Sequence, residues 1–258
     1  MSHKILVMSP LHQNGATVVS TMIAQTAAYV GKTSSLIYTQ HDSLLPTYLG
    51  VDVEEDPTMT IMQVVKLIDS NAIEDKDIID YMIPFSKNTY VMNITDPTLS
   101  EAESVSVVNH VYKHVPTDIV VCDNSDDLGS PQTEALMDTS DLIVLVIQPN
   151  LKNLKHIKSW LTSDILKDKQ PYVVLNYYDD VITSVRNYSR LLGIPAGRLF
   201  KVHYSPFIAK CCNNGHLHEI VPCIKNMDAR VLNMSADIKE FEMGIISSLL
   251  MSRRGGDI

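Results

Sequence analysis

Leu142-Ile143-Val144-Leu145-Val146-Ile147 is a run of six aliphatic residues, and Ile119-Val120-Val121-Cys122 is also apolar at every position. A strand that alternates apolar and polar residues has one buried face, whereas a strand that is apolar throughout is covered on both faces. The two stretches therefore predict strands of a central parallel sheet that has helices packed on both sides.

The rest of the chain repeats this alternation of strand-length apolar runs and helical segments. Strand, helix and strand in succession give right-handed crossovers, and repeated crossovers build a doubly wound, mainly parallel α/β sheet. We expect one domain over residues 1–258. The expected strands are Lys4–Ser9, Ser35–Thr39, Thr89–Asn93, Asp118–Asp123, Leu142–Gln148, Tyr172–Asn176 and Leu199–His203, and the expected helices are Ala16–Val30, Thr60–Ser70, Ser100–His114, Leu151–Leu166, Val181–Leu192 and about 236–252.

Composition excludes several classes of protein. Hydrophobic residues make up 45% of the chain and charged residues 20%, as in globular proteins and unlike disordered ones. A formal net charge of −9 argues against non-specific nucleic-acid binding by the whole surface, because it repels phosphate backbones. No run reaches the roughly 18 apolar residues that span a bilayer. We expect a cytoplasmic protein whose four cysteines are reduced thiols.

A loop with features of a phosphate-binding site follows the first expected strand. It reads Ser9-Pro10-Leu11-His12-Gln13-Asn14-Gly15-Ala16-Thr17 and leads into a helix. A working phosphate loop wraps backbone N–H groups around the phosphates, places a lysine against them and puts a Ser or Thr hydroxyl on Mg²⁺. Gly15 and Thr17 meet these needs, but Ala16 stands at the lysine position. Gly31-Lys32-Thr33-Ser34 has the wrong polarity for such a loop, and we expect Gly31 to cap a helix.

Three later segments carry further signals at the ends of expected strands. Asp118–Asp123 resembles a Walker B strand that ends in a carboxylate, and Val173–Asn176 ends in an amide. Tyr204-Ser205-Pro206-Phe207 is followed by Gly215. In this order, the features resemble the ParA/MinD family of deviant Walker-A ATPases over nearly the whole chain. That family has a loop of the form K-G-G-x-G-K-T.

The resemblance implies a P-loop NTPase-like fold and a site for ATP or ADP with Mg²⁺. Leu11 falls on the first, family-specific lysine and Ala16 on the Walker lysine, while Gln40 replaces a carboxylate expected near the attacking water. His12 is expected to be a solvent-facing loop residue. By resemblance, nucleotide contacts come from Asn14, Gly15, Ala16, Thr17, Val18, Asn176 and Pro206, and Mg²⁺ contacts come from Thr17 and Asp123.

Loss of both lysines lowers the activity to be expected. A charge-assisted hydrogen bond contributes about 1.5–3 kcal/mol, so two lost contacts weaken phosphate binding by roughly 3–6 kcal/mol. We therefore expect at most a weak ATPase, and the sequence leaves nucleotide binding open. Family members with atypical loops, such as the TadZ/CpaE-like pilus-positioning proteins, are thought to act more by assembly than by turnover.

Several functions remain in competition. The resemblance implies a positioning or assembly protein that forms a homodimer and recruits a protein partner in pilus assembly, conjugation, division or partition. The alternative is a nucleotide-independent interaction module on the same fold. A tyrosine-kinase domain is disfavoured because no tyrosine follows Tyr204, and partition through non-specific DNA is disfavoured by the net charge.

The C-terminal helix also has two interpretations. Its apolar residues at positions 241, 245, 249 and 250 form one stripe, and Arg253 and Arg254 follow. It is similar in character to the membrane-targeting tail of MinD, which would give peripheral contact at the inner face of the membrane. The other interpretation is a final helix packed on the domain or on a dimer partner.

The segment Cys211–His218, with Cys223 beyond it, contains metal-binding residue types. Adjacent cysteines do not fit the paired spacing of zinc sites, so no structural metal is expected. We predict a helix, a glycine turn and another helix instead.

Overall fold

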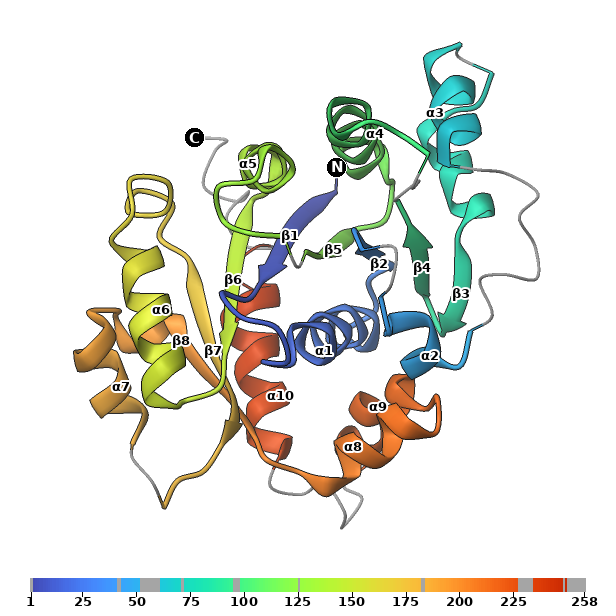
Figure 1. The fold of residues 1–258 in the computed structure, drawn as a ribbon. Helices are drawn as coiled ribbons and strands as arrows, with labels where there is room; N and C mark the ends of the chain where they lie inside the picture. Colours follow the sequence, from blue (N-terminus) through green and yellow to red (C-terminus); the bar gives the residue numbers. More distant parts are fainter. Residues whose placement is uncertain are drawn as a thin grey trace, which may run out of the picture.

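The computed structural model describes residues 2–40, 43–51, 61–70, 72–94, 98–124, 126–181, 184–226, 234–247 and 249 (Figure 1). Eight strands form one sheet in the order β3-β4-β2-β5-β1-β6-β7-β8. All neighbouring pairs are parallel except β3 and β4, which are antiparallel. The strands are β1 His3–Met8, β2 Ser34–Tyr38, β3 Ile83–Ser86, β4 Thr89–Asn93, β5 Ile119–Asp123, β6 Leu142–Ile147, β7 Tyr172–Tyr178 and β8 Leu199–His203.

Helices cover both faces of this sheet. The α-helices are α1 Ala16–Tyr29, α2 Leu45–Leu49, α3 Ile61–Asp69, α4 Glu101–His114, α5 Pro131–Thr139, α6 Leu151–Leu161, α7 Val185–Leu192, α8 Pro206–Asn213, α9 Ile220–Lys225 and α10 Ser235–Phe241. Short turns of 3₁₀-helix lie at η1 Asp75–Tyr81, η2 Ala196–Arg198 and η3 Leu217–Glu219, and a π-helical segment, η5 Glu242–Ile246, continues α10.

The two faces of the central strands enter two separate cores. Ile5 and Val7 of β1 pack with α1, α8, α9 and α10, whereas Leu6 and Met8 pack with α3–α7. In Figure 1, α1 and α10 lie together on one side of the sheet, and α4 and α5 lie on the other. Each central strand is buried on both faces, which is why its sequence is apolar at every position. The predicted fold class, a doubly wound and mainly parallel α/β sheet, is confirmed.

Some elements differ from those predicted. The helix expected over Leu151–Leu166 ends at Leu161, where the Thr162 hydroxyl donates to the Lys158 carbonyl oxygen at 3.0 Å, and turns follow. The helix expected from Val181 begins at Val185, after Ser184. The edge strand β3 was not predicted, because Ile83-Pro84-Phe85-Ser86 is short and contains a proline.

The apolar stripe of the C-terminal helix packs inside the domain. Phe241, Ile245 and Leu249 are buried in the core that contains α1 and β8. The helix approaches β8 closely, since a Cβ at Gly244 would lie 2.3 Å from the Phe200 ring. These contacts agree with the interpretation of a helix packed on the domain. Leu250 and the segment 251–258, which includes Arg253 and Arg254, lie outside the described residues.

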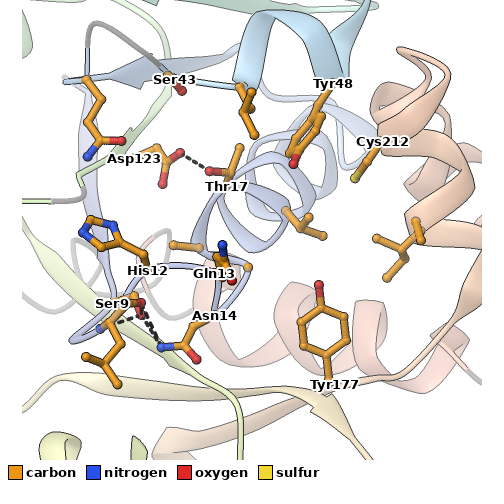
Figure 2. Close-up of a pocket in the computed structure, with 18 of the residues that line it drawn as sticks. Ser9, His12, Gln13, Asn14, Thr17, Ser43, Tyr48, Asp123, Tyr177 and Cys212 are labelled. Carbon is orange, nitrogen blue, oxygen red and sulfur yellow. Dashed lines mark hydrogen bonds between the residues drawn. The ribbon is translucent and has the colours of Figure 1, made fainter.

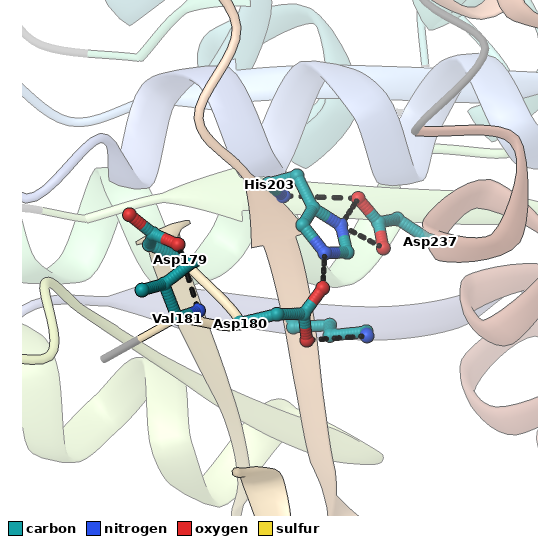
Figure 3. A network of polar contacts seen from close by, with 6 residues as sticks. Asp179, Asp180, Val181, His203 and Asp237 are labelled. Carbon is teal, nitrogen blue, oxygen red and sulfur yellow. Dashed lines mark hydrogen bonds and ion pairs between the residues drawn. The ribbon is translucent and has the colours of Figure 1, made fainter. Parts of the chain in front are cut away.

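A polar network joins α10 to the carboxyl end of β8 (Figure 3). The His203 ring lies between two carboxylates, with Nδ1 3.0 Å from Asp237 and Nε2 2.9 Å from Asp180. Burial disfavours the charged form of the His203 ring and lowers its pKa. The hydrogen bonds to Asp180 and Asp237 favour the charged form and outweigh burial, so the pKa of His203 is raised. Burial also raises the pKa of Asp237 to about 6. The network therefore fixes α10 against the sheet through groups whose charges depend on one another.

Candidate functional site

The loop between β1 and α1 lies where the sequence placed a phosphate loop, at the carboxyl end of the parallel sheet. Gly15 precedes α1 with φ 83°, a conformation that glycine adopts without strain. A Cβ at this position would lie 2.0 Å from the Asn176 side-chain nitrogen. Both the backbone angle and the lack of space therefore require glycine.

Asn14 holds the loop in shape from within. Its side-chain Nδ2 donates to Ser9 Oγ at 2.8 Å and to the Leu11 carbonyl oxygen at 2.9 Å. Its Oδ1 accepts from Gln148 N at 3.2 Å and from Asn153 Nδ2 at 2.7 Å. The residue is only 3% exposed, so these bonds are made out of water and are costly to leave unmade.

Asn176 supports the loop from below. It lies near the end of β7, and its Nδ2 donates to the Asn14 carbonyl oxygen at 2.8 Å. The sequence resemblance implies that the Asn176 side chain contacts the adenine of a nucleotide. In the structure its donor group is directed to the loop backbone, and the side chain is almost fully buried.

Thr17, in the first turn of α1, contacts Asp123, at the end of β5. Thr17 Oγ1 donates to Asp123 Oδ2 at 2.7 Å (Figure 2). Ser20 Oγ donates to Asp123 Oδ1 at 3.3 Å. Burial raises the pKa of Asp123 to about 6, although both hydroxyls stabilise the carboxylate. A carboxylate and a threonine hydroxyl are oxygen ligands of the kind that Mg²⁺ accepts.

These residues border a cavity of about 440 Å³. Figure 2 shows Tyr48, Tyr177 and Cys212 facing the loop residues Gln13 and Asn14 across the space. Among the described residues that line the cavity, none is lysine or arginine. They are Ser9, Leu11, His12, Gln13, Asn14, Gly15, Ala16, Thr17, Val18, Gln40, Ser43, Leu44, Tyr48, Asp123, Asn124, Tyr177, Ile208, Ala209, Cys212 and Asn213.

Two lining residues have an unusual backbone. Gln13 has φ 64° and Tyr177 has φ 55°, in the left-handed region that non-glycine residues seldom occupy. Such residues persist only where the surroundings hold them, and they cluster at functional sites. Here the Gln148 side-chain Nε2 donates to the Gln13 carbonyl oxygen at 2.8 Å.

The structure brings most of the predicted site residues together. The cavity is lined by Asn14, Gly15, Ala16, Thr17, Val18 and Asp123. His12 and Leu11 also line it, so both residues at lysine positions, Leu11 and Ala16, face the cavity. Asn176 lies beneath Gly15 instead of on the wall. Pro206 begins α8, whose later residues Ile208, Ala209 and Cys212 line the cavity, but Pro206 itself does not.

Sequence reasoning missed the aromatic wall. Tyr48 comes from α2 and Tyr177 from a bulge at the end of β7, and only tertiary structure brings them to one cavity. The Tyr204 ring lies beside that of Tyr177, with ring centroids 6.2 Å apart and the planes tilted by 43°. The position of Tyr177 after a strand was the available signal, because side chains at carboxyl ends of parallel strands surround the ligand site.

Comparison with known proteins is informative for structure only. No family model and no curated protein sequence matches the chain. The MinC:MinD cell division complex of Aquifex aeolicus aligns with TM-score 0.69 and 14% identity over 95% of this chain and 96% of that one. This chain has the MinD/ParA fold. MinD with Mg-ADP from Pyrococcus horikoshii OT3 aligns with TM-score 0.67 and 15% identity over 96% of this chain and 98% of that one. A ParA family ATPase from Chlorobium tepidum TLS aligns with TM-score 0.65 and 12% identity over 97% of this chain and 99% of that one.

The cysteine- and histidine-rich segment forms the predicted helix, glycine turn and helix. Cys211 and Cys212 lie in α8, Gly215 turns the chain with φ 71°, and η3 and α9 follow. Ligand atoms of His216, His218 and Glu219 lie within 4.8 Å of one another. His216 Nδ1 and Glu219 Oε1 are hydrogen-bonded to each other at 3.0 Å, so these two partly exposed groups satisfy each other.

No helix in the described part of the chain combines the length and the hydropathy needed to cross a bilayer.

Proposed function

We propose that this chain is a positioning or assembly protein on the MinD/ParA fold that acts as a pseudo-ATPase. One observation carries the proposal. The cavity keeps the Thr17–Asp123 pair at the place of a nucleotide site, but no lysine or arginine is among the described residues that line it. The scaffold for Mg²⁺ is retained while the cations for phosphate are lost.

The residues present fit a nucleotide only in part. Thr17 and Asp123 would hold Mg²⁺, which would neutralise charge on the phosphates. The N-terminus of α1 favours anions through its partial positive charge. Asp123 repels phosphate wherever no cation lies between them. We therefore expect Mg-ATP or Mg-ADP to bind weakly, and ATP without Mg²⁺ to bind more weakly still.

Hydrolysis is expected to be absent. Charge on a transferring phosphoryl group needs compensation, and a single added arginine is worth about 10³–10⁵ in rate in related enzymes. Leu11 and Ala16 supply none. Gln40, which lines the cavity, is an amide and cannot act as a carboxylate base.

Assembly is proposed to use the face around the cavity mouth. Leu44 and Tyr177 line the cavity while remaining exposed, and the exposed Tyr204 ring lies beside that of Tyr177. An apolar and aromatic mouth of this kind is typical of interaction surfaces. We propose that it forms a homodimer or receives a protein partner. A cytoplasmic location, with peripheral membrane contact through the last helix, stays a prediction.

Calorimetry tests the nucleotide part of this proposal. Titration with ATP at millimolar concentration, with and without Mg²⁺, should show weak binding that requires Mg²⁺, and phosphate release should stay at background. Turnover comparable to that of lysine-containing relatives would contradict the pseudo-ATPase assignment.

A second candidate is an interaction module that needs no nucleotide, and the Asn14 network favours it. The loop is already held by hydrogen bonds from Ser9, Gln148 and Asn153, without help from a ligand. Light scattering after gel filtration separates the two candidates. Dimers that form equally with and without Mg-ATP support the module, and dimers that require Mg-ATP support the switch.

A further inference from the structure

A groove of about 640 Å³ lies at the amino end of strands β7 and β8. Its walls are the last turns of α6 and α7 and the loops that lead from these helices into the two strands. Figure 1 shows the two helices side by side. Both helices run back from the carboxyl ends of β6 and β7, so the groove lies at the opposite end of the strands from the Thr17–Asp123 pair.

Positive charge gathers around this groove, which we call the basic groove. Its lining includes four cationic residues, Lys158, Lys167, Arg190 and Arg198. None of the lining residues that the structure describes is acidic, although the chain as a whole has a net charge of −9. Lys167 pairs with the exposed Asp164 at 2.6 Å, and the other three form no ion pair within the described part of the chain.

Neutral groups hold both arginines in place. Arg198 donates to the Gln170 carbonyl oxygen at 3.1 Å, and its guanidinium carbon lies 5.9 Å from the centre of the Tyr172 ring. Arg190 donates to the Asn187 side chain. A guanidinium group has five N–H donors, and the described contacts use two of those of Arg198 and one of those of Arg190. The charges are therefore positioned without being neutralised.

Helix ends account for only part of this charge. Lys158 and Arg190 lie in the last turns of α6 and α7, where a cation interacts favourably with the free carbonyl groups. Those carbonyl groups amount to roughly half a negative elementary charge for each helix, which is less than the full charge of either side chain. A positive surplus therefore remains at the groove.

Aliphatic side chains form the rest of the wall. Leu166, Leu192 and Ile194 line the groove and are buried, while Leu191 lines it and is 50% exposed. No aromatic residue is among the lining residues that the structure describes. The basic groove thus combines cations with an aliphatic surface.

This combination narrows the class of ligand. Grooves that bind single-stranded nucleic acid offer aromatic rings for base stacking, and no such ring is found among the described lining residues. A membrane surface is bound by a protruding apolar stripe beside basic residues, whereas here most of the apolar surface is buried between two helices. Carboxylates beside aliphatic side chains complement both parts of the wall.

We propose that the basic groove binds an acidic, aliphatic segment of a partner protein. Its carboxylates pair with Arg190 and Arg198, since guanidinium groups bind carboxylates bidentately. Its aliphatic side chains pack on the surface that includes Leu191. The volume of the groove suits a few residues of such a segment. The inference goes beyond the proposed function, because assembly there uses the mouth of the other cavity, and a partner in the basic groove leaves that mouth free.

Fluorescence polarisation with a labelled peptide of four Glu-Leu repeats tests both components of the wall. We expect a dissociation constant of about 0.1 mM at low salt and roughly tenfold weaker binding at about 0.5 M salt, because salt screens exposed charges. Peptides of four Gln-Leu repeats or four Glu-Ser repeats each lack one component and should bind at least about fivefold more weakly. Absence of binding by the Glu-Leu peptide, or equal binding by all three peptides, would overturn the proposal.

Variants of matched charge locate the binding site. Lys158→Gln combined with Arg190→Gln neutralises two cations of the groove and should weaken binding of the Glu-Leu peptide about fivefold to tenfold. Lys152→Gln combined with Lys155→Gln removes the same charge from exposed positions of α6 that do not line the groove. This control should keep the affinity within about twofold. An equal loss in both double variants would show attraction by the whole protein and contradict the assignment.

Leu191→Gln tests the aliphatic contact. Because Leu191 is half-exposed, the variant should keep the parent melting temperature while it binds the Glu-Leu peptide about fivefold more weakly. Leu151→Gln is the matched control, since Leu151 is 79% exposed in the first turn of α6 and does not line the groove. Unchanged affinity in Leu191→Gln would reduce the interaction to charge alone and overturn the proposal.

Competition distinguishes the peptide from other polyanions. Vesicles rich in phosphatidylserine, or a single-stranded oligothymidine, are added to the peptide complex at an equal concentration of negative charge. The peptide should remain bound. Its displacement from the parent protein by either competitor would show that the groove prefers a lipid surface or a nucleic acid, and the assignment to a protein segment would be wrong.

Discussion

The two ends of α1 treat buried polar groups in opposite ways. At its N-terminal end, Asn14, Thr17 and Asp123 are all hydrogen-bonded within the protein. At its C-terminal end, Gln25 and Thr89 have unpaired atoms within the described part of the chain. The polar groups at the first end resemble those of a nucleotide site, and they are hydrogen-bonded without a ligand. The second end carries no recognised motif, and its unpaired atoms are closed off from solvent.

The largest expected effect comes from filling the space at Gly15. Gly15→Ala adds a Cβ 2.0 Å from Asn176 Nδ2 at a positive φ. Displacement of Asn176 breaks its bond to the loop, so we expect a loss of about 3 kcal/mol in unfolding free energy, measured by urea denaturation. Gly193→Ala is the control, because Gly193 also has positive φ but nothing within 4 Å. It should cost about 1 kcal/mol, and an equal loss at both sites would contradict the role of Asn176.

The pH dependence of stability tests whether the Asp123 carboxyl is buried at the N-terminal end of α1. The pKa of Asp123 is about 6 when folded and near the ordinary 3.8 when unfolded, because burial disfavours the charge. The folded protein thus holds the extra proton between these pH values. Unfolding free energy should fall as pH rises through this window, by about 3 kcal/mol in total, and be level above it.

Asp123→Asn isolates that contribution from those of other groups, including Asp237 and His203. The difference in stability between parent and variant should change across the window from pH 4 to pH 6 and be constant outside it. Thermal denaturation at several pH values measures the difference. A constant difference throughout would mean that the Asp123 carboxyl is not desolvated as the structure indicates.

A lysine introduced at the phosphate-loop position should strengthen nucleotide binding at the N-terminal end of α1. Ala16→Lys places an ammonium where the cavity has none among its described lining residues. We expect Mg-ATP affinity to rise about tenfold to hundredfold, since a charge-assisted contact is worth about 1.5–3 kcal/mol. Ala209→Lys lines the same cavity from α8 and serves as the control in calorimetry. An equal gain from both would indicate general attraction and not a specific phosphate contact.

The smallest expected effects on stability come from threonine-to-valine substitutions, one near each end of α1. Thr17→Val removes a hydroxyl that donates to Asp123 and should destabilise the protein by about 2 kcal/mol. Thr89→Val removes an unpaired hydroxyl and should stabilise it by about 1 kcal/mol. Denaturation of the two variants in parallel checks the signs. The same sign at both positions would remove the distinction between the ends.

The extent to which the sequence predicted the fold follows from burial. Seven of the eight strands were predicted within a few residues, because strands such as β5 and β6 are buried on both faces and carry the pattern of that burial. The edge strand β3 has no such pattern. Helix α5 was missed although Ser130-Pro131 is a recognisable helix start, since only four of its nine residues are buried and its apolar face is narrow.

The candidate site was predictable where it is local in sequence. Residues 14–18 form one loop and helix start, and Asp123 ends a recognisable strand, and in the structure they line the same cavity. Asn176 was assigned by resemblance, from its place at the end of an expected strand, but sequence does not give the direction of a side chain. Tyr48, Tyr177 and Cys212 come from segments far apart, and the unpaired atoms of Gln25 are visible only when every neighbour is in place.

Helices α8 and α9 have a consequence for communication across the molecule. Ile208, Ala209 and Cys212 of α8 line the cavity at the phosphate-loop position, and Val221 and Pro222 of α9 line another cavity, of about 330 Å³, at the C-terminal end of α1. Only η3 and a glycine turn separate the two helices. A molecule that shifts this pair on entering one cavity alters the affinity of the other. Thermodynamic linkage then requires the same factor in both directions, whichever site is filled first.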